Sequence, residues 1–327
     1  MPVFTGPLAD MNACPQVSVL VLNWNKKEYL HRCLSSVFRQ NYPNIEILFI
    51  DNGSDDGSVE LVRKHYPQAH IIALDHNMGF SAANNIGISQ ASGDYIMTLN
   101  NDTELDEGCV SELIEVIEQF PQAWSCSPKI VSFDNPPIIV NVGIGVKDRW
   151  PTDRGHGEPD DGRYDQIEEI LGPNGGAGLY RKAVLDEIGG YDEDFVAYFE
   201  DVDLAWRARL TGWTSVYAPE AICRHAFGGT NKTRPFYIEY HIFRNIIWLY
   251  IKDIPGAYLW KKVPGLLKQE IIFWKSHLRR GGAKWLKMKI DTYKKLPRMM
   301  KKRRYIQRNR HIDDKEFERW FHKLLPR

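Results

Sequence analysis

Small polar and acidic residues follow four predicted strands of the chain, at the point where each strand ends. The strands are short β-branched runs at residues 17–22, 45–50, 70–74 and 95–99, and segments of helical periodicity separate them. The residues at the strand ends are Asn23, Asn25, Asp51, Asn77, Gly79, Asn100, Asn101 and Asp102. One such group predicts only a turn, since turns favour Asn, Asp and Gly. Four groups in succession predict a ligand site, because ligands of open parallel sheets bind beyond the carboxyl ends of the strands.

The predicted site lacks the glycine-rich loops that bind phosphate through backbone amides. No G-x-G-x-x-G follows the first strand, and no G-x-x-x-x-G-K-[ST] occurs in the chain. A carboxylate that holds a metal ion, which in turn binds a diphosphate, is the expected substitute. Mg²⁺ and Mn²⁺ prefer oxygen ligands and take few of them from protein, the others coming from phosphate and water.

A second group of carboxylates lies at Glu200, Asp201 and Asp203. An acidic helix N-terminus, which the helix macrodipole favours, accounts for several carboxylates but not for the aromatic residues around them. Those aromatic residues are Tyr198, Phe199 and Trp206. Carboxylates clustered beside apolar walls raise one another's pKa, which suits a general base. We expect Asp203 to point away from the others and to be structural.

The alternation of strands and helices predicts an α/β fold with a largely parallel sheet. Asp106 is the expected N-cap of a helix that ends near residue 120, and a short strand is expected at residues 214–217. Residues 151–168 are polar and rich in Gly, Pro and Asp, which predicts a mobile loop. Two interpretations of this loop are open: it acts as a lid or acceptor contact, or it is a solvated insertion. The glycines at 175–178 allow backbone to pass close beneath a ligand.

The composition is that of a globular protein without a disulfide framework. Hydrophobic residues make up 43% and charged residues 26% of the chain. The five cysteines are scattered and form no C-x-x-C pair, which favours reduced thiols. The first sixteen residues have no basic or long apolar stretch, and no apolar run approaches the roughly 20 residues of a membrane span. We therefore expect a cytoplasmic protein without a signal peptide or transmembrane helix.

The net charge of zero conceals a division of the chain. Residues 1–230 contain 16 Lys and Arg against 34 Asp and Glu, a net charge of −18, and residues 231–327 contain 26 against 8, a net charge of +18. This asymmetry predicts two units with different partners. The acidic unit suits a metal ion, and the basic unit suits phosphates or anionic lipid.

The basic segment 231–327 interleaves its charges with aromatic residues. They include Trp248, Tyr250, Tyr258, Trp260, Phe273, Trp274 and Trp285. A helical extension that packs on the rest of the chain, a nucleic-acid-binding region and a peripheral membrane contact are the competing interpretations. No recognition motif supports nucleic acid. We expect a mixture of packing and contact with anionic lipid at the inner face of the cell membrane.

Six ordered motifs in residues 17–230 resemble glycosyltransferase family 2, whose members have the GT-A fold. The motifs are V-S-V-L-V-L-N-W-N, I-D-N-G-S-D-D-G-S, N-x-G-F-S-x-A-N-N, L-N-N-D-T-E-L, G-G-Y-D-E-D-F-x-x-Y-F-E-D-V-D-L-x-x-R and H-x-x-G-G-T. Within the family, the chain is most similar to bacterial rhamnosyltransferase-type members that build cell-surface polysaccharide. The resemblance implies a GT-A catalytic domain at 1–230, with a Rossmann-like, mostly parallel mixed sheet, and a C-terminal helical extension at 231–327.

The resemblance also implies which residues bind the donor. Asp51 is expected to hydrogen-bond the base or ribose of the nucleotide. The same pocket is expected to contain Asn23, Asn25, Asn77, Gly79, Asn100 and Asn101. Asn100, Asn101 and Asp102 occupy the position of the family's D-x-D motif. The first Asp of that motif is replaced by Asn100, so metal ligation is expected to rest on Asp102 and on His225, which matches the late family histidine.

By the same resemblance Asp201 is the general base that takes the proton from the acceptor hydroxyl, and Glu200 contacts the acceptor. The acceptor oxygen attacks the anomeric carbon, the metal stabilises the leaving diphosphate, and this single displacement inverts the anomeric configuration. The implied protein is an inverting, Mg²⁺- or Mn²⁺-dependent glycosyltransferase. It is expected to move L-rhamnose from dTDP-rhamnose to a hydroxyl of a saccharide or lipid-linked saccharide acceptor.

Two alternatives stay open, a transferase for UDP-linked hexoses and a non-catalytic module that binds nucleotide sugars. A processive synthase is disfavoured because it would carry Q-x-x-R-W and transmembrane helices. A nucleotidyltransferase is disfavoured because N-W-N-K-K after the first strand is not a glycine- and arginine-rich loop.

Overall fold

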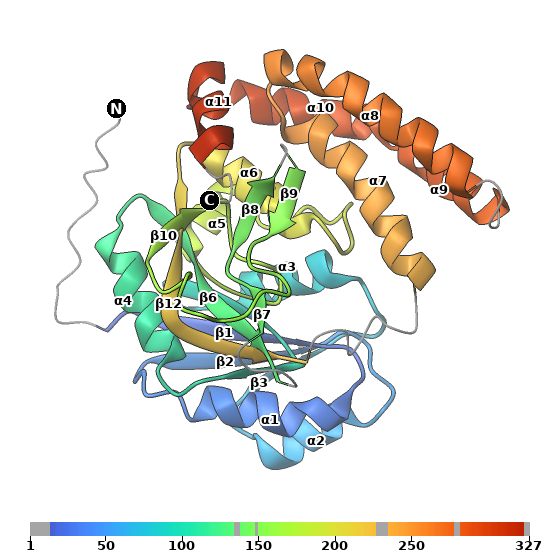
Figure 1. Ribbon diagram of the computed structural model, residues 1–327. Helices are drawn as coiled ribbons and strands as arrows, with labels where there is room; N and C mark the ends of the chain where they lie inside the picture. The colour runs from blue at the N-terminus through green and yellow to red at the C-terminus, as the bar shows by residue number, and fades with distance from the viewer. Residues whose placement is uncertain (1–13, 134–137, 148–149, 227–234, 278–281, 324–327) are drawn as a thin grey trace.

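A mixed ten-stranded sheet covered by helices on both faces forms the larger part of the protein (Figure 1). The computed structural model describes residues 14–133, 138–147, 150–226, 235–277 and 282–323. The strands are β1 (Val17–Asn23), β2 (Ile45–Asp51), β3 (His70–Ala73), β4 (Tyr95–Asn100), β5 (Thr103–Leu105), β6 (Ala123–Ser132), β7 (Ile139–Asn141), β8 (Ile144–Lys147), β9 (Trp150–Asp153), β10 (Glu168–Ile170), β11 (Ala177–Arg181) and β12 (Thr214–His225). The helices are α1 (Lys27–Phe38), α2 (Ser58–His65), α3 (Phe80–Gln90), α4 (Cys109–Gln119), α5 (Lys182–Ile188), α6 (Glu200–Leu210), α7 (Pro235–Asp253), α8 (Gly256–His277), α9 (Gly282–Lys294), α10 (Leu296–Arg308) and α11 (Asp314–Lys323).

The sheet order is β10-β12-β6-β11-β4-β1-β2-β3, with β5 paired to β12 and β7 to β6. Strands β3, β2, β1 and β4 are parallel, so their carboxyl ends meet at one edge of the sheet. Strand β11 is antiparallel to β4 and β6, whereas β12 runs parallel to β6. This arrangement confirms the expected α/β fold with a mixed sheet. Strands β8 and β9 form a separate two-stranded hairpin.

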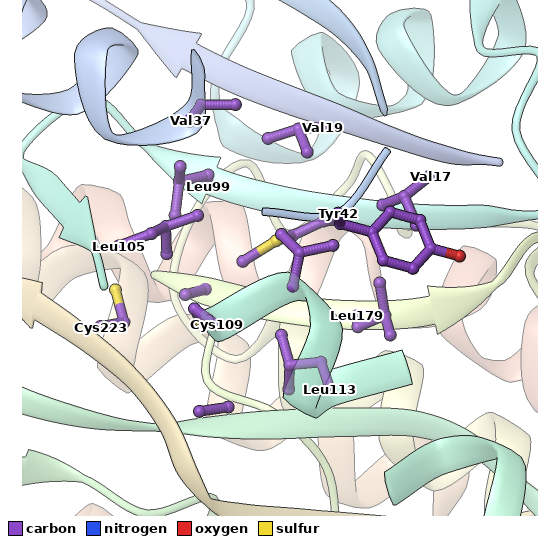
Figure 2. Close-up of a cluster of buried hydrophobic side chains, with 14 of the residues drawn as sticks. Val17, Val19, Val37, Tyr42, Leu99, Leu105, Cys109, Leu113, Leu179 and Cys223 are labelled. Atoms are coloured by element: carbon purple, nitrogen blue, oxygen red, sulfur yellow. The ribbon is translucent and has the colours of Figure 1, made fainter. Parts of the chain in front are cut away.

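Helices α1 to α6, which lie within residues 14–226, bury apolar stripes against the two faces of the sheet. In α1 the buried Leu30, Cys33, Leu34 and Val37 recur at helical spacing on one side. Helices α1, α2 and α4 share a core with one face of β1 and β4, part of which Figure 2 shows. Helices α3, α5 and α6 share a core with the opposite face. The site at the strand ends is therefore positioned by a close-packed scaffold.

Most predicted elements of this part are confirmed, with two corrections. The helix after β5 begins at Cys109 rather than next to Asp106, and no side chain caps it. The Asp106 side chain instead pairs with Arg224 of β12. The strand predicted at 214–217 continues to His225, because it pairs first with β6 and then with β5.

Residues 151–168 contain more structure than the predicted loop. The first three belong to β9, and the last lies in β10. The segment is fastened to the sheet by ion pairs, such as those that Lys129 of β6 makes with Asp160 at 3.0 Å and Asp165 at 2.7 Å. Burial of Lys129 alone would lower its pKa, but these two carboxylates raise it.

The C-terminal helices α7 to α11, orange to red in Figure 1, pack together and cover α6. Five of the seven aromatic residues singled out from the sequence are buried: Trp248, Tyr250, Tyr258, Phe273 and Trp285. The predicted C-terminal helical extension is therefore confirmed, and packing explains these aromatic side chains. The boundary expected at residue 230, and Gly228, Gly229 and Thr230 of the last motif, lie outside the described residues.

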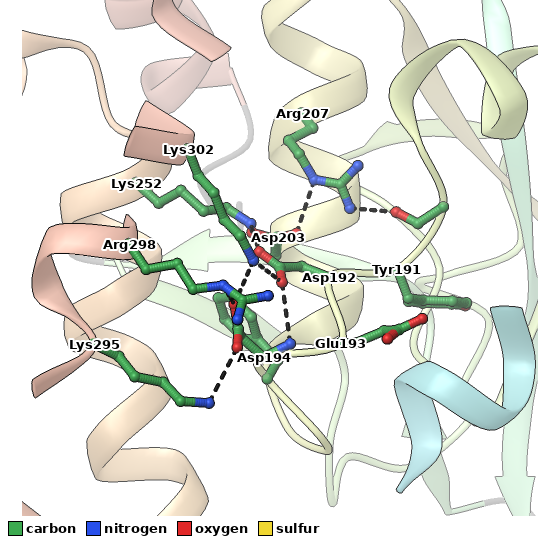
Figure 3. Close-up of polar contacts among 12 residues, drawn as sticks. Tyr191, Asp192, Glu193, Asp194, Asp203, Arg207, Lys252, Lys295, Arg298 and Lys302 are labelled. Atoms are coloured by element: carbon green, nitrogen blue, oxygen red, sulfur yellow. Dashed lines mark hydrogen bonds and ion pairs between the residues drawn. The ribbon is translucent and has the colours of Figure 1, made fainter. Parts of the chain in front are cut away.

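Buried ion pairs join the C-terminal helices to α6 and to the segment that precedes it (Figure 3). Lys252 of α7 is 1% exposed and pairs with Asp192, at 2.5 Å, and with Asp203 of α6. Lys302 of α10 pairs with Asp192 and Asp194. Burial alone would raise the pKa of Asp192, but Lys252 and Lys302 hold it well below its usual range. As expected, Asp203 is structural.

No helix within the described ranges has both the length and the apolar character needed to cross a membrane.

Candidate functional site

A cavity of about 760 Å³ opens at the carboxyl edge of the parallel strands. Its size is within the range of small-ligand sites. Residues from both halves of the fold line it, and those that the argument uses are Trp24, Asn52, Asn77, Gly79, Asn100, Asn101, Asp102, Thr152, Asp153, Gly175, Gly176, Tyr198, Glu200, Asp201, His225 and Tyr237. The structure thus brings the predicted metal and base residues, and five of the eight predicted donor residues, to one cavity.

The loop between β3 and α3 forms one wall of the cavity. The Oδ1 atom of Asn77 accepts hydrogen bonds from the Gly79 amide, at 2.8 Å, and from Asn52 Nδ2, at 3.2 Å. Gly79 has a φ of 87°, and a Cβ atom there would lie 2.7 Å from Val196 Cγ1. Only glycine combines this backbone with so close a neighbour. Asn77 and Gly79 therefore lie where the sequence placed them, in the wall of the cavity.

Three of the predicted donor residues lie behind the wall rather than in it. Asn23 is fully buried, and its Nδ2 atom donates to Asp51 Oδ1 at 2.7 Å. Asp51 is 2% exposed, and its other oxygen accepts the Ser54 amide at 2.8 Å. Asn25 uses its Oδ1 atom to accept the Asp55 amide. In this structure the printed hydrogen bonds of these three side chains lie within the strand-end turns, and the side chains are not part of the cavity lining. Donor binding by these three residues stays a prediction.

The D-x-D-like segment lies at the centre of the cavity floor. Asn101 donates to Asn23 Oδ1 at 2.6 Å and to the Asn25 carbonyl at 3.0 Å, which ties it to the end of β1. Asn100 ends β4, and its amide bonds the Gly176 carbonyl at 3.0 Å. Asp102 follows directly and is 6% exposed. The segment is therefore held by backbone and amide contacts on both sides.

The sequence-distant pair Asp102 and His225 is brought together by the sheet. Strand β5 pairs with the end of β12 so that Thr103 is opposite His225, and the Ala226 amide bonds the Asp102 carbonyl at 2.9 Å. The His225 Nε2 atom lies 3.1 Å from Asp102 Oδ1, and its Nδ1 atom is buried without a hydrogen-bond partner. Across the described residues, no group of three or more His, Cys, Asp or Glu gathers that could hold a metal ion.

The carboxylate–imidazole pair fits Mg²⁺ or Mn²⁺ only if most ligands come from the substrate. These ions take six ligands, and two from protein leave the others to diphosphate oxygens and water. The Nδ1 atom of His225 is buried and has no hydrogen-bond partner, so structural hydrogen bonds do not hold both ring nitrogens. The donor set is thus suited to a metal that arrives with, or is completed by, a nucleotide diphosphate.

Glu200 and Asp201, at the N-terminus of α6, form the opposite wall of the cavity. The pKa of Asp201 is raised to about 6, mainly by burial and to a smaller extent by the charge of Asp153, although the Gly175 amide, 2.9 Å from Oδ2, opposes the shift. Burial, with the charge of Asp201 next, holds the pKa of Glu200 well above its usual range. Glu200 Oε2 is buried without a hydrogen-bond partner. Both pKa values are thus raised, and the two neighbouring carboxyls titrate as an interacting pair.

Two further segments, the glycine cluster at 175–178 and part of the segment 151–168, also contribute to the cavity. Gly175 and Gly176 line it with backbone, as expected from the glycine cluster, and the Gly175 amide orients Asp201. Thr152 and Asp153, from the segment expected to be a loop, also line it. An Asn174 amide bonds Asp153 Oδ1 at 3.1 Å, so that this carboxylate is anchored.

Sequence reasoning missed several residues of the lining. Trp24 and Asn52 lie in the wall, whereas their neighbours Asn23 and Asp51 are turned inward. Alternation of side chains at a strand end is the signal that could have distinguished them, since consecutive residues face opposite sides. Tyr237 reaches the cavity from α7. No local motif announces it, because its place depends on the packing of the C-terminal helices.

Comparison with known proteins gives consistent results. The glycosyl transferase family 2 matches residues 18–189, which is more than half of the chain. The N-acetylglucosaminyl-diphospho-decaprenol L-rhamnosyltransferase of Mycobacterium tuberculosis is 25% identical over 254 residues, which cover 71% of this chain and 83% of that protein. The poly-β-1,6-N-acetyl-D-glucosamine synthase of Staphylococcus epidermidis is 28% identical over 213 residues, covering 63% of this chain and 49% of the synthase.

Among solved structures, a mannosyltransferase from Pyrobaculum calidifontis, in complex with GDP-Man and Mn²⁺, superposes with a TM-score of 0.56 at 16% sequence identity. The superposition covers 90% of this chain and 86% of the mannosyltransferase. At this identity the likeness concerns the fold, which is GT-A. The sheet, the cavity at its carboxyl edge and the family match together lead to one conclusion: the chain belongs to glycosyl transferase family 2 and is a glycosyltransferase with the GT-A fold.

Proposed function

We propose that the protein is an inverting, metal-dependent glycosyltransferase that moves L-rhamnose from dTDP-rhamnose to a hydroxyl of a saccharide or lipid-linked saccharide acceptor. The observation that carries the proposal is one cavity with the Asp102–His225 pair on its floor and the Glu200–Asp201 pair on its wall. The first pair suits a metal and diphosphate, and the second suits an acceptor hydroxyl. The donor is inferred from the rhamnosyltransferase relative.

Asp201 is proposed as the general base. Its pKa of about 6 keeps it ionised at neutral pH yet basic enough to accept a proton in the transition state. The amides of Gly175 and Val202 hold its two oxygens, at 2.9 and 2.8 Å, so that the carboxylate keeps one orientation. Glu200, whose pKa is held well above its usual range by burial and by the Asp201 charge, is proposed to hydrogen-bond the acceptor through its unpartnered carboxyl. The two neighbouring carboxyls thus have different proposed roles.

Asp102 and His225 are proposed to hold Mg²⁺ or Mn²⁺ together with the donor diphosphate. When bound, the ion supplies a positive charge that stabilises the leaving nucleoside diphosphate. Asn100 presents its side-chain amide beside it, which suits ribose or phosphate oxygens, whereas Asn101 offers its Oδ1 atom, because its Nδ2 donates to Asn23 and Asn25. Asn77 and Gly79 form the adjacent wall against which the nucleotide is proposed to lie.

The experiment combines donor choice and base loss. Purified protein is incubated with dTDP-rhamnose or UDP-linked hexoses, with Mn²⁺ or Mg²⁺, and with a polyprenyl-diphosphate-linked N-acetylglucosamine acceptor, and the product's anomeric configuration is read by NMR. We expect inverted rhamnoside from the wild type. Asp201→Asn should lose 10²- to 10⁴-fold in turnover, while the donor dissociation constant stays within about twofold. Transfer only from a UDP-hexose would replace the donor, and comparable turnover in the variant would remove Asp201 as base.

We also propose that the enzyme contacts anionic membrane through α8 and α9. Three apolar side chains recur along the solvent face of α8, where packing does not explain them: Trp260, Leu267 and Ile271, 76%, 58% and 56% exposed. Lysines lie beside this stripe at a seven-residue spacing, at Lys261, Lys268 and Lys275. Helix α9 continues the pattern with Leu286, Ile290 and Tyr293. An apolar face bordered by cations complements the headgroup region of an anionic bilayer.

The position of this face supports a lipid-linked acceptor. The C-terminal half of α8 and the N-terminal half of α9 pack on Phe236, Tyr240 and Phe243 of α7, through Phe273 and Trp285. The same end of α7 carries Tyr237, which lines the cavity. An acceptor anchored in the bilayer would thus be presented near the cavity.

Vesicle sedimentation tests the membrane contact. The double variant Leu267→Glu/Ile271→Glu should lose at least tenfold in partitioning to vesicles that contain phosphatidylglycerol, and high salt should weaken the wild type. Phe120→Glu is the matched control, since Phe120 is an exposed aromatic of the catalytic part, 39% exposed. Equal partitioning of the double variant and the control would exclude this face as the contact.

A further inference from the structure

The backbone just before the proposed base has an unusual conformation. Val196, Tyr198 and Phe199 have φ angles of 67°, 67° and 66°, in the left-handed region. Such angles are uncommon without glycine, and for a β-branched residue such as Val196 they mark an outlier. Each costs about 1–3 kcal/mol and persists only where the surroundings impose it. Something in the structure must therefore hold residues 195–199 in place.

Asn245 of α7 is the group that holds this segment. Its side chain is fully buried, and its Nδ2 atom lies within hydrogen-bonding distance of three carbonyl oxygens of the segment. Those are the carbonyls of Phe195, at 2.9 Å, Ala197, at 2.9 Å, and Tyr198, at 2.7 Å. Three carbonyls of an irregular backbone are thus tied to one amide.

Arg244 supports Asn245 from behind. Its Nε atom donates to Asn245 Oδ1 at 2.8 Å, which fixes the orientation of the amide so that Nδ2 faces the segment. Its Nη2 atom donates to the carbonyls of Asp194, at 3.1 Å, and Phe195, at 2.7 Å. Arg244 is itself 5% exposed and lies over the Trp248 ring. The two neighbouring side chains together satisfy four consecutive or nearly consecutive carbonyls.

The held segment connects the two sides of the cavity. On the donor side, the Val196 carbonyl accepts the amides of Phe80, at 2.7 Å, and Ser81, at 3.2 Å, where α3 begins. On the base side, the Phe199 carbonyl accepts the Asp203 amide at 2.9 Å and so starts α6. Asp201 lies within this first turn. A displacement of the segment would therefore move the base relative to the donor wall.

We propose that Asn245, oriented by Arg244, is a positioning residue that holds residues 195–199 so that Asp201 faces the cavity. The C-terminal helices then complete the catalytic apparatus in addition to any role as an anchor. The proposal rests on the proposed function for the role of Asp201. It adds that the helix outside the family-matched residues 18–189 sets the geometry of the base.

The test uses Asn245→Asp, which keeps the size of the side chain and can still accept from Arg244 but cannot donate to the three carbonyls. We expect kcat for transfer to fall about 10- to 100-fold, since small misplacement of a catalytic group has effects of this size. The dissociation constant for nucleotide with Mn²⁺, measured by titration calorimetry, should stay within about twofold. Turnover is normalised to the binding stoichiometry, so loss of folded protein does not count. Glu239→Ala, an exposed position of the same helix, is the control.

Amide hydrogen exchange gives a second readout that does not depend on activity. The amides of Phe80, Ser81 and Asp203 bond carbonyls of the held segment, and they should exchange faster in Asn245→Asp than in the wild type and in Glu239→Ala. Arg244→Lys, a milder change, should shift both readouts in the same direction to a smaller extent.

Wild-type kcat or unchanged exchange of these amides in Asn245→Asp would overturn the proposal. Faster exchange in the variant, together with a wild type that transfers no sugar, would leave the clamp standing and overturn the proposed function instead.

Discussion

Replacing the proposed base should make the protein more stable, and the gain should depend on pH. Burial raises the pKa of Asp201 from 3.8 to about 6, so the folded protein disfavours the ionised form that the unfolded chain adopts above about pH 4. Wild-type stability contributed by this group is thus complete below pH 4 and is lost as the pH rises through 6. Asn, which is neutral throughout, removes this penalty.

The magnitude follows from the shift. About two pKa units correspond to about 3 kcal/mol, and because the Asp201 side chain is half-buried, solvent reduces this to about 2 kcal/mol. The side-chain amide introduced by Asp201→Asn cannot accept both the Gly175 and the Val202 amide, which costs about 1 kcal/mol at every pH. The absolute change in stability therefore mixes two effects. The change in that difference between pH 4 and pH 7 isolates the carboxyl.

Urea denaturation at pH 4, 5, 6, 7 and 8, without donor or metal, measures this quantity. The unfolding free energy of Asp201→Asn minus that of the wild type should rise by about 2 kcal/mol between pH 4 and pH 7. Asp75→Asn, an exposed position away from the cavity, is the control and should follow the wild type. A difference that is constant within about 0.5 kcal/mol over this range would refute the raised pKa and, with it, the reason for assigning Asp201 as the base.

Further predictions concern the acid limb, the metal and the buried ion pairs. The kcat/KM of transfer should fall about tenfold per pH unit below pH 6, as Asp201 becomes protonated. Asp153→Asn should shift this acid limb of the pH profile to lower pH, since burial and then the Asp153 charge raise the pKa of Asp201. A pH profile that does not shift would contradict the contribution of Asp153. Asp102→Asn should raise the Mn²⁺ concentration for half-maximal activity at least tenfold, and an unchanged titration would remove it as a ligand. Lys252→Met should lower the unfolding free energy, measured by urea denaturation, by about 3–5 kcal/mol, because it leaves buried carboxylates without their partner. The control Lys261→Met, at an exposed ion pair, should change the unfolding free energy by less than about 1 kcal/mol.

The opposite charges of the two parts of the chain have a partly internal explanation. The sequence suggested different external partners for a −18 and a +18 segment. In the structure, Asp192 and Asp194 of the acidic part bind Lys252 and Lys302 of the basic part across their contact. Lys261, on the exposed face of α8, also pairs within the chain, with Glu318 at 2.8 Å. Complementary charge within the chain thus uses cations of α7, α8 and α10.

Local pattern sufficed for most of the scaffold. Each strand of the parallel block is a short β-branched run, and α1 carries its apolar residues at helical spacing, so the elements and their order follow from side-chain periodicity. The carboxyl ends of parallel strands share one edge of the sheet, so the sequence predicts that Asn77, Asn100 and Asp102 lie in one region. The helix start at Cys109 was missed because the predicted cap, Asp106, is held by Arg224, a residue far along the chain.

The contacts between distant segments could not be predicted from the sequence, because they depend on the tertiary structure. Alternation at the strand ends turned Asn23 and Asp51 inward and left Trp24 and Asn52 in the cavity. The pairing of β5 with β12 put His225 beside Asp102, and the packing of α7 put Asn245 under the segment before Asp201. Residue type and strand position are local properties, so the sequence alone sufficed to nominate the residues that are proposed to take part in sugar transfer. The distances between these residues, their burial and their pKa values arise from sheet pairing and helix packing between distant segments. No local sequence pattern encodes such contacts.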